Sequence, residues 1–332
     1  MSDGAPPPAL SVAMSVYNAG PYLDEAILSI RRQTFRDFEF LILDDGSKDN
    51  SPAIAAAHAA QDARIRVIAR ENRGLIVSLN QLLVEARAPL IARMDADDTC
   101  LPDRFERQMA FLAAHPDHGV LGSACQYIGP DGLPLDRPPL VRALTHEALL
   151  ASLEDKPTIN HNAVIYSRDL VRSVGGYRAA FVHAEDYDLW LRLSQLTKMA
   201  NLPEKLVNYR IYPEQVSNRH LITQTRNCAL AWLAHRERLA GRPDPIGDRA
   251  AMPADDQLDA IFGPGAAAYV HRRVVARSLY ATDALTGDGW PMLLSHARMN
   301  RQDRNLWRLV MRMARDGKPL HAGRLGMALL AG

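Results

Sequence analysis

The chain has 332 residues and few of the features that mark secreted, membrane-spanning or nucleic-acid-binding proteins. Its three cysteines, Cys100, Cys125 and Cys228, are scattered and odd in number, so they predict no disulfide framework and favour a reducing compartment. No apolar run reaches the roughly 18 residues of a membrane span. The formal net charge of +1 argues against a nucleic-acid partner held by bulk electrostatics.

The start of the chain, residues 1–8, is rich in proline and small side chains. It lacks the basic flank and apolar stretch of a signal peptide, so we expect the protein to work in the cytoplasm. Hydrophobic residues make up 47% of the chain and charged residues 23%, as is usual for a globular protein. The length allows one large domain or two unequal ones.

Strand-like and helix-like segments alternate through the first 118 residues. Apolar runs that end at turn residues predict buried strands, and each is followed by apolar side chains at helical spacing. This order predicts an α/β fold with a doubly wound, Rossmann-like parallel sheet. The expected strands are 10–17, 38–43, 65–69 and 90–94, and the expected helices begin near Pro21, Ser51, Leu75 and Pro102.

The rhythm changes after residue 118. A strand at 120–128 is followed by a Pro/Gly-rich loop at 129–139, and shorter elements up to residue 212 predict an α+β second half. From Leu221 the pattern is mostly helical. We therefore expect a catalytic domain over 1–220 and a helical C-terminal region over 221–332.

Acidic side chains follow two of the predicted strands directly, at 44–47 (DDGS) and 95–98 (DADD). A third acidic pair, Glu185 and Asp186, precedes an amphipathic helical segment. Carboxylates at strand ends face the crevice where open α/β sheets bind ligands. The sequence therefore predicts that one crevice collects these groups.

The 95–98 cluster has the chemistry of a cation site. Asp95 and Asp97 can present oxygens to one divalent cation, and with a nucleotide diphosphate and waters they complete the six oxygens that Mg²⁺ or Mn²⁺ prefers. The competing interpretation is an N-cap of the next helix, formed by Asp98 or Thr99. An EF-hand loop is excluded, because Cys100 stands where that loop needs glycine.

The other two clusters each have a plain alternative. Asp45 can accept the imide N–H of a pyrimidine or a ribose hydroxyl while the Tyr17 ring stacks on the base, or 44–47 is simply an Asp-Gly turn. Glu185 and Asp186 can take the proton of an acceptor hydroxyl, or they only complement the dipole of the following helix.

Several further side chains are candidates with equally plain alternatives. Arg73, Arg93 and Arg210 can pair with phosphate oxygens or lie solvated on the surface. His161 can contact sugar hydroxyls or be a satisfied core histidine. Trp190 lies at helical spacing, which favours a core position over a sugar platform.

In combination and in order, these segments resemble family 2 glycosyltransferases with the GT-A fold. The resemblance runs over residues 9–219, about two thirds of the chain. It rests on the segments 11–18 (SVAMSVYN), 33–39 (QTFRDFE), 44–47 (DDGS), 93–98 (RMDADD), 175–178 (GGYR) and 184–190 (AEDYDLW).

The resemblance implies a nucleotide-binding sheet, an α+β acceptor half and an inverting displacement in which the acceptor hydroxyl attacks opposite the diphosphate of a UDP-sugar. It also implies a role at each matching position. These are Tyr17 stacking on uracil, Asp45 bonding its imide, Asp95 near the ribose, Asp97 as metal ligand, His161 near the donor sugar, and Asp186 as catalytic base supported by Glu185.

Two departures from the family pattern bear on the reaction. Many relatives carry a histidine two residues after the position of Arg210, and this chain has Tyr212 there. The Gln-x-x-Arg-Trp motif of processive members is missing, since residues 215–220 (QVSNRH) have the wrong spacing. This favours addition of a single sugar to a glycan or lipid-linked acceptor.

Two other functions compete. A sugar-1-phosphate nucleotidyltransferase has a similar sheet, but its Gly-rich phosphate loop is missing, since residues 15–20 contain one glycine. An inert sugar-nucleotide-binding protein would not need both a metal pair and a base.

The C-terminal region contains one basic amphipathic segment. Arg304, Arg308, Arg312 and Arg315 line one helical face, and apolar side chains occupy the other. This face either makes a peripheral contact with an anionic inner-membrane surface or is a solvated surface of a packed helix.

Overall fold

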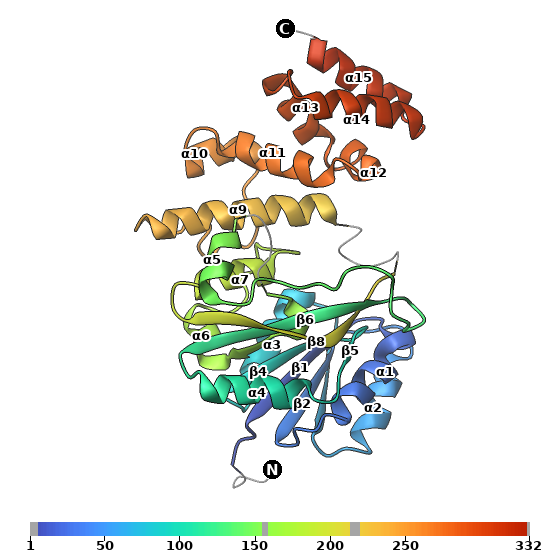
Figure 1. Ribbon diagram of the computed structural model, residues 1–332, viewed down its shortest axis with the longest axis vertical. Helices are drawn as coiled ribbons and strands as arrows, with labels where there is room; N and C mark the ends of the chain where they lie inside the picture. The colour runs from blue at the N-terminus through green and yellow to red at the C-terminus, as the bar shows by residue number, and fades with distance from the viewer. Residues whose placement is uncertain (1–5, 155–158, 213–219, 331–332) are drawn as a thin grey trace. The chain divides into compact units, whose positions relative to one another are not determined.

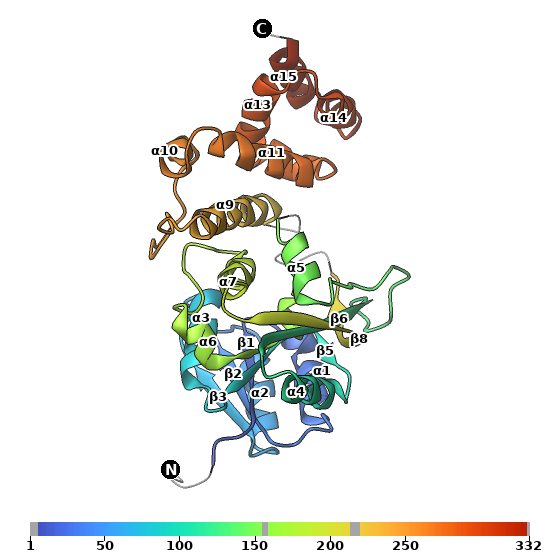
Figure 2. The same cartoon turned by 60° about the vertical axis from the view of Figure 1, so that its left-hand side comes forward.

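The computed structural model describes residues 6–154, 159–212 and 220–330, drawn in Figures 1 and 2. The chain divides into two units. The first comprises Met1–Arg178 and Glu185–Pro213, and the second comprises Ala179–Ala184 and Glu214–Gly332. The segment 215–219, on which the argument about processivity rests, lies outside the described residues.

The first unit is built on one mixed sheet. Its described residues form eight strands in the order β3-β2-β1-β4-β7-β6-β8-β5. The strands are β1 (Leu10–Val16), β2 (Phe38–Asp44), β3 (Ile65–Ala69), β4 (Leu90–Asp95), β5 (Thr99–Cys100), β6 (His118–Ile128), β7 (Ile165–Ser167) and β8 (Lys198–Arg210).

The parallel part of the sheet brings the acidic segments together. β1 pairs in parallel with both β2 and β4, and the registers set Val16 opposite Asp44 and Ser15 opposite Asp95. The carboxyl ends of the three strands therefore meet at one edge, as the sequence predicted. β7 pairs antiparallel with β4 and with β6, which begins the α+β half.

Helices cover both faces of the sheet (Figure 2). Leu23, Ile27 and Phe105 belong to the core on the face of α1, α2 and α4, whereas Leu79, Leu82 and Trp190 belong to the core on the face of α3, α5, α6 and α7. The helices are α1 (Gly20–Arg31), α2 (Ser51–Ala59), α3 (Leu75–Glu85), α4 (Arg104–Ala114), α5 (His146–Ser152), α6 (Arg168–Ser173) and α7 (Glu185–Leu193), with a 3₁₀ turn η1 (His161–Ala163).

Two details of the sequence interpretation are wrong. Asp98 and Thr99 do not cap the following helix: the strand β5 intervenes, and the N-cap residue of α4 is Asp103. The short helices α5 and α6 were not expected, because seven and six residues are too few to establish a helical period.

The turn before α7 is held by polar contacts that reach across the fold. The Asn80 side chain of α3 donates to the Tyr177 carbonyl oxygen at 2.7 Å and accepts from the Tyr177 amide at 2.8 Å. Asp188, which is fully buried, pairs with Arg178 and with Arg192. These contacts fix the start of α7, where the third acidic pair lies.

The second unit is helical in its described residues. Its core combines Leu230, Val270, Val274, Leu293 and Leu309. In the part of the chain that the structure describes, no helix is both long and apolar enough to cross a bilayer. The elements are α9 (Leu221–Leu239), η2 (Asp255–Gln257), α10 (Leu258–Phe262), α11 (Ala266–Ser278), α12 (Thr282–Thr286), α13 (Trp290–Met299), α14 (Arg304–Arg315) and α15 (Pro319–Leu330).

The two glycines before Tyr177 provide a matched test of this turn. Gly175 and Gly176 have φ angles of 82° and 69°, but a Cβ at Gly176 would also lie 2.5 Å from the Asn80 side-chain oxygen, whereas a Cβ at Gly175 would meet nothing within 4 Å. We expect Gly175→Ala to lower the free energy of unfolding by about 1–2 kcal/mol. Gly176→Ala should lower it by ~1–2 kcal/mol more, because Asn80 must move. Urea denaturation measures both, and equal losses would contradict the role given to Asn80.

Candidate active site

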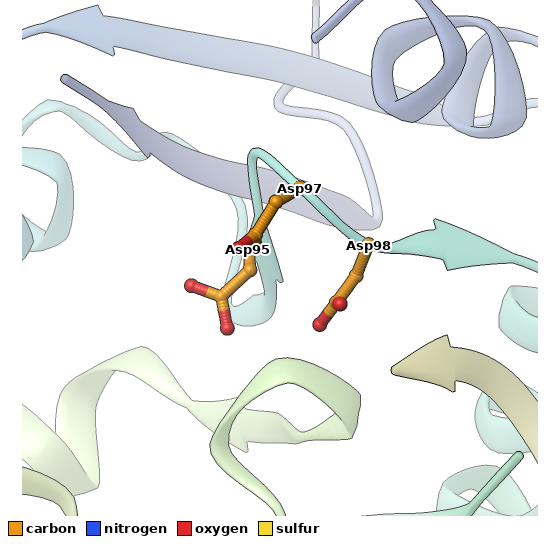
Figure 3. Close-up of side chains that lie close together, drawn as sticks. All are labelled: Asp95, Asp97 and Asp98. Atoms are coloured by element: carbon orange, nitrogen blue, oxygen red, sulfur yellow. The ribbon is translucent and has the colours of Figure 1, made fainter. Parts of the chain in front are cut away.

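The 95–98 turn follows β4 at the carboxyl edge of the sheet and gathers three carboxylates (Figure 3). Asp95, Asp97 and Asp98 each offer one oxygen, and these oxygens lie within 4.8 Å of one another. Oxygens that share one small cation lie roughly 4–5 Å apart at most, so this donor set fits a divalent cation. Their proximity disfavours the charged forms of these carboxyls when no cation is bound.

Asp97 contributes one oxygen to this cluster. The Tyr212 hydroxyl donates to its Oδ2 at 2.8 Å. Burial, and next the charge of Asp95, raises the pKa of Asp97 to about 6. Tyr212, which stands where many relatives carry histidine, therefore contacts the metal motif through a hydrogen bond.

Asp98 is a positioning group. Its side chain is buried, Oδ1 accepts the Arg210 amide at 2.8 Å, and Oδ2 accepts the Asn162 side-chain amide at 2.5 Å. Both oxygens thus tie the turn to β8 and η1. Burial, followed by the charge of Asp97, raises the pKa of Asp98 well above its usual value.

Arg93 lies beneath the cluster on β4. It is 5% exposed, and its guanidinium pairs with Oδ2 of Asp95. The positive charge of Arg93 also lowers the pKa of Asp97, Glu185 and Asp186, against the larger effect of burial. The charge of Arg93 therefore favours the ionised forms of carboxyls in both acidic segments.

Glu185 and Asp186 form the first turn of α7. Glu185 is 7% exposed, and burial, followed by the charge of Asp186, raises its pKa to about 7. Asp186 is less buried than Glu185, and its Oδ1 accepts the Tyr187 amide at 2.7 Å. Burial also raises the pKa of Asp186, which makes its carboxylate a stronger base.

The ends of β1 and β2 form the other side of the crevice. Tyr17 follows β1 and is 54% exposed, as a ring that stacks on a base must be. Asn18, next to it, has a φ of 52°, and its side chain accepts the Lys48 amide while its own amide donates to Ser47. These bonds hold the 44–47 loop beside the Tyr17 ring.

Asp45 already has several partners. Its two oxygens accept the amides of Arg73 and Gly74 at 3.0 and 2.8 Å, and the Arg70 guanidinium lies 2.8 Å from Oδ1. A carboxylate has about four acceptor positions, so one is left for a ligand N–H. Asp45 is 2% exposed and shapes the loop before α3 through these bonds.

The arginines that the sequence singled out differ in environment. Arg210 is 1% exposed and donates to the carbonyl oxygens of Asp97, Gly129 and Pro130 and to Glu25, so the interpretation of Arg210 as a phosphate ligand is wrong. The Arg73 side chain is 58% exposed. Of these two arginines, only Arg73 offers its guanidinium to a diphosphate.

His161 lies on η1 and contacts aromatic side chains. Its Nε2 is 3.0 Å from the Tyr177 hydroxyl, and its ring meets Trp190 edge to face at 6.0 Å. Burial, and then the charge of Arg93, lowers its pKa well below the usual value, so the ring is neutral. Trp190 is completely buried, which confirms its core position.

Sequence reasoning missed the residues that hold the site in place. Asn80, Asn162 and Asp188 fix the turns that carry the carboxylates. Nothing in the local sequence marks Asn80 or Asn162, because their partners lie 97 and 64 residues away along the chain. Asp188 carried the one available signal, an acidic residue at an apolar position of an amphipathic helix.

The raised pKa of Glu185 predicts a pH dependence of stability in the metal-free protein. The usual value is 4.5 and the folded value about 7, so the native state binds more protons than the unfolded state between these limits. The free energy of unfolding therefore falls as the pH rises through this window. We expect Glu185→Gln to reduce that slope in urea titrations with chelator present. Glu71→Gln, at a side chain that is 86% exposed, is the control, and an unchanged slope in Glu185→Gln would contradict the buried environment.

Sequence comparison finds relatives across the first unit. Residues 11–174 match the family described as "Glycosyl transferase family 2". The chain is 34% identical over 214 residues to the amylovoran biosynthesis glycosyltransferase AmsE of Erwinia amylovora, covering 63% of this chain and 79% of that protein.

Solved structures share the fold. TarS 1–349 of S. aureus in complex with UDP-GlcNAc matches with a TM-score of 0.56 at 15% identity, covering 95% of this chain and 90% of that one. The mannosyltransferase PcManGT of Pyrobaculum calidifontis in complex with GDP-Man and Mn²⁺ matches with a TM-score of 0.54 at 16% identity, covering 99% and 90%.

Proposed function

Because the chain belongs to glycosyl transferase family 2, and is a glycosyltransferase with the GT-A fold, we propose that it adds one sugar from a UDP-sugar to an acceptor hydroxyl with inversion. The acceptor is a glycan or a lipid-linked sugar of a bacterial polysaccharide pathway, in keeping with the role of the relative AmsE in amylovoran biosynthesis. Family membership removes the nucleotidyltransferase and the inert binding protein from consideration. The observation that carries the proposal is the cluster of Asp95, Asp97 and Asp98 after β4, whose oxygens lie within 4.8 Å of one another.

The donor would bind across the carboxyl ends of β1, β2 and β4. Tyr17 would stack on uracil, Asp45 would accept the imide N–H at its remaining acceptor position, and Arg73 would reach the diphosphate. Solved relatives bind UDP-GlcNAc and GDP-Man. The nucleobase of the donor is therefore tested by measuring transfer from a panel of UDP- and GDP-sugars.

Asp95 and Asp97 would hold Mg²⁺ or Mn²⁺, and a relative carries Mn²⁺. The cation would supply positive charge that offsets the negative charge on the departing diphosphate. Arg93 orients Asp95 through their ion pair, and Tyr212 holds Asp97 through a hydrogen bond. His161, neutral and half-buried, would contact the donor sugar beside Tyr177.

Asp186 would be the base that takes the proton of the attacking hydroxyl. It is the more accessible of the two α7 carboxylates, and its raised pKa gives the carboxylate a higher proton affinity. Glu185 lies beside it and keeps the pocket acidic. The acceptor oxygen would then attack the anomeric carbon on the side opposite the diphosphate.

The cytoplasm is the compartment that we propose, since Cys100, Cys125 and Cys228 form no disulfide in the structure. The acceptor proposal also gives a use to the basic helix α14, whose arginines suit a peripheral contact with an anionic inner-membrane surface.

The base is tested by Asp186→Asn, which keeps the oxygen that accepts the Tyr187 amide. We expect kcat to fall about 10²–10⁴-fold while the affinity for UDP is retained. Transfer is followed by UDP release with a mixed polysaccharide-precursor acceptor pool, and affinity by calorimetry. Asp169→Asn, at an α6 side chain that is 74% exposed, is the charge-matched control. Wild-type turnover in Asp186→Asn would rule out this base.

The cation site is tested by Asp97→Asn. We expect the heat of Mn²⁺ binding in the presence of UDP to disappear and transfer to become insensitive to chelator, at a residual rate. Tyr212→Phe keeps both carboxylates and loses only the hydrogen bond, so it should bind Mn²⁺ and remain chelator-sensitive. Retention of Mn²⁺ binding in Asp97→Asn would exclude Asp97 as a ligand.

A further inference from the structure

A hollow in the second unit is lined by arginines that the proposed chemistry does not use. It lies between α13 and α15, which pack together (Figure 1), and has a volume of about 360 Å³. Its walls are formed by Leu294, Arg298, Arg301, Arg324, Met327 and Ala328.

The three guanidinium groups of this hollow have no carboxylate partner among the described residues. Arg301 donates only to the carbonyl oxygen of Arg298, at 3.2 Å, and Arg324 lies 5.7 Å from the centre of the Trp290 ring. All three side chains are exposed. Three like charges around one hollow repel one another, and an anion placed among them offsets that repulsion through charge-assisted hydrogen bonds.

The face of α15 that carries Arg324 also exposes apolar side chains. Leu320, Arg324 and Met327 follow one another at spacings of four and three residues, so they share a face of α15. Leu320 is 82% exposed and Met327 is 63% exposed. Helix α15 contains no acidic residue. A water-soluble anion would leave these apolar side chains in water. A lipid phosphate brings acyl chains that cover them.

The neighbouring helix α14 repeats this combination. Leu306, Leu309 and Met313 are buried in the core, so the apolar side that the sequence showed is already occupied. The opposite side exposes Trp307 at 40% and Met311 at 73% between Arg304, Arg308 and Arg315. Exposed tryptophan and methionine among arginines are typical of helices that lie at a lipid interface.

Positive charge is concentrated in the last part of the sequence. Residues 290–332 contain eight arginines and lysines against two aspartates, a net charge of +6, which leaves −5 for residues 1–289. An anionic surface therefore attracts this part of the chain and repels the remainder.

We propose that the hollow of Arg298, Arg301 and Arg324 binds the phosphate of an anionic membrane lipid, with Met327 and Leu320 against its acyl chains. This inference specifies the membrane contact proposed above and does not depend on sugar transfer. Vesicle binding needs no donor or acceptor, so its failure would leave the glycosyltransferase proposal untouched.

The test is flotation of the full-length protein with vesicles of three compositions. These are phosphatidylcholine with phosphatidic acid, phosphatidylcholine with oleate at equal surface potential, and phosphatidylcholine alone. We expect binding to follow that order, because phosphate offers the guanidinium groups more acceptor oxygens than a carboxylate does. Arg298→Gln, Arg301→Gln and Arg324→Gln together should weaken binding to phosphatidic acid vesicles on the order of 100-fold.

The matched control removes the same charge from the same unit. It combines Arg236→Gln, Arg272→Gln and Arg277→Gln, at exposed positions of α9 and α11, and should bind close to wild type. Equal losses of vesicle binding in the two triple variants would contradict a specific site and indicate attraction by overall positive charge. The triple lysine variant of the pocket keeps the charge, and we expect it to lose the preference for phosphatidic acid over oleate.

Inorganic phosphate is the probe that distinguishes a soluble phosphate ligand from a lipid phosphate. Calorimetry should show weak binding that the pocket variant loses, and phosphate should displace the protein from phosphatidic acid vesicles. Phosphate binding without vesicle binding would overturn the lipid assignment, and absence of both would overturn the site. Thermal unfolding confirms that each variant is folded.

Discussion

The site depends on one buried positive charge. Arg93 lies on a central strand, pairs with Asp95, and favours the ionised forms of Asp97, Glu185 and Asp186. Its charge opposes the burial that favours the neutral forms of these carboxyls, and a protonated carboxyl neither ligates a cation nor accepts a proton. A guanidinium suits this position because it stays charged at every physiological pH.

The parallel and antiparallel strands of the sheet have different roles in the site. The parallel strands bring Tyr17, Asp45 and Asp95 to a single edge, and the antiparallel strands and η1 supply the side chains that hold the 95–98 turn. Asp98 joins the two halves, since one of its oxygens reaches β8 and the other reaches η1. Nucleotide recognition and acceptor recognition can therefore change separately while the turn between them stays in place.

Much of this arrangement could be predicted from the chain alone. Apolar runs with acidic or turn residues at their ends predict the strands 10–17, 38–43, 65–69 and 90–94. Parallel pairing then brings the ends of these strands together. Tertiary partners could not be predicted. Arg210 looked like a phosphate ligand, yet four acceptors from distant segments enclose it. Asp98 looked like a helix cap because the two-residue strand β5 is too short to leave a sequence pattern.

The uneven charge of the chain also affects how the protein behaves as a solute. A sequence pI near 7.8 suggests weak retention on any ion exchanger at neutral pH. However, residues 290–332 carry a net charge of +6 and can adsorb to a cation-exchange resin, although the remainder of the chain is acidic. Molecules of opposite local charge attract one another at low ionic strength, so dilute buffers should promote reversible self-association that added salt disperses.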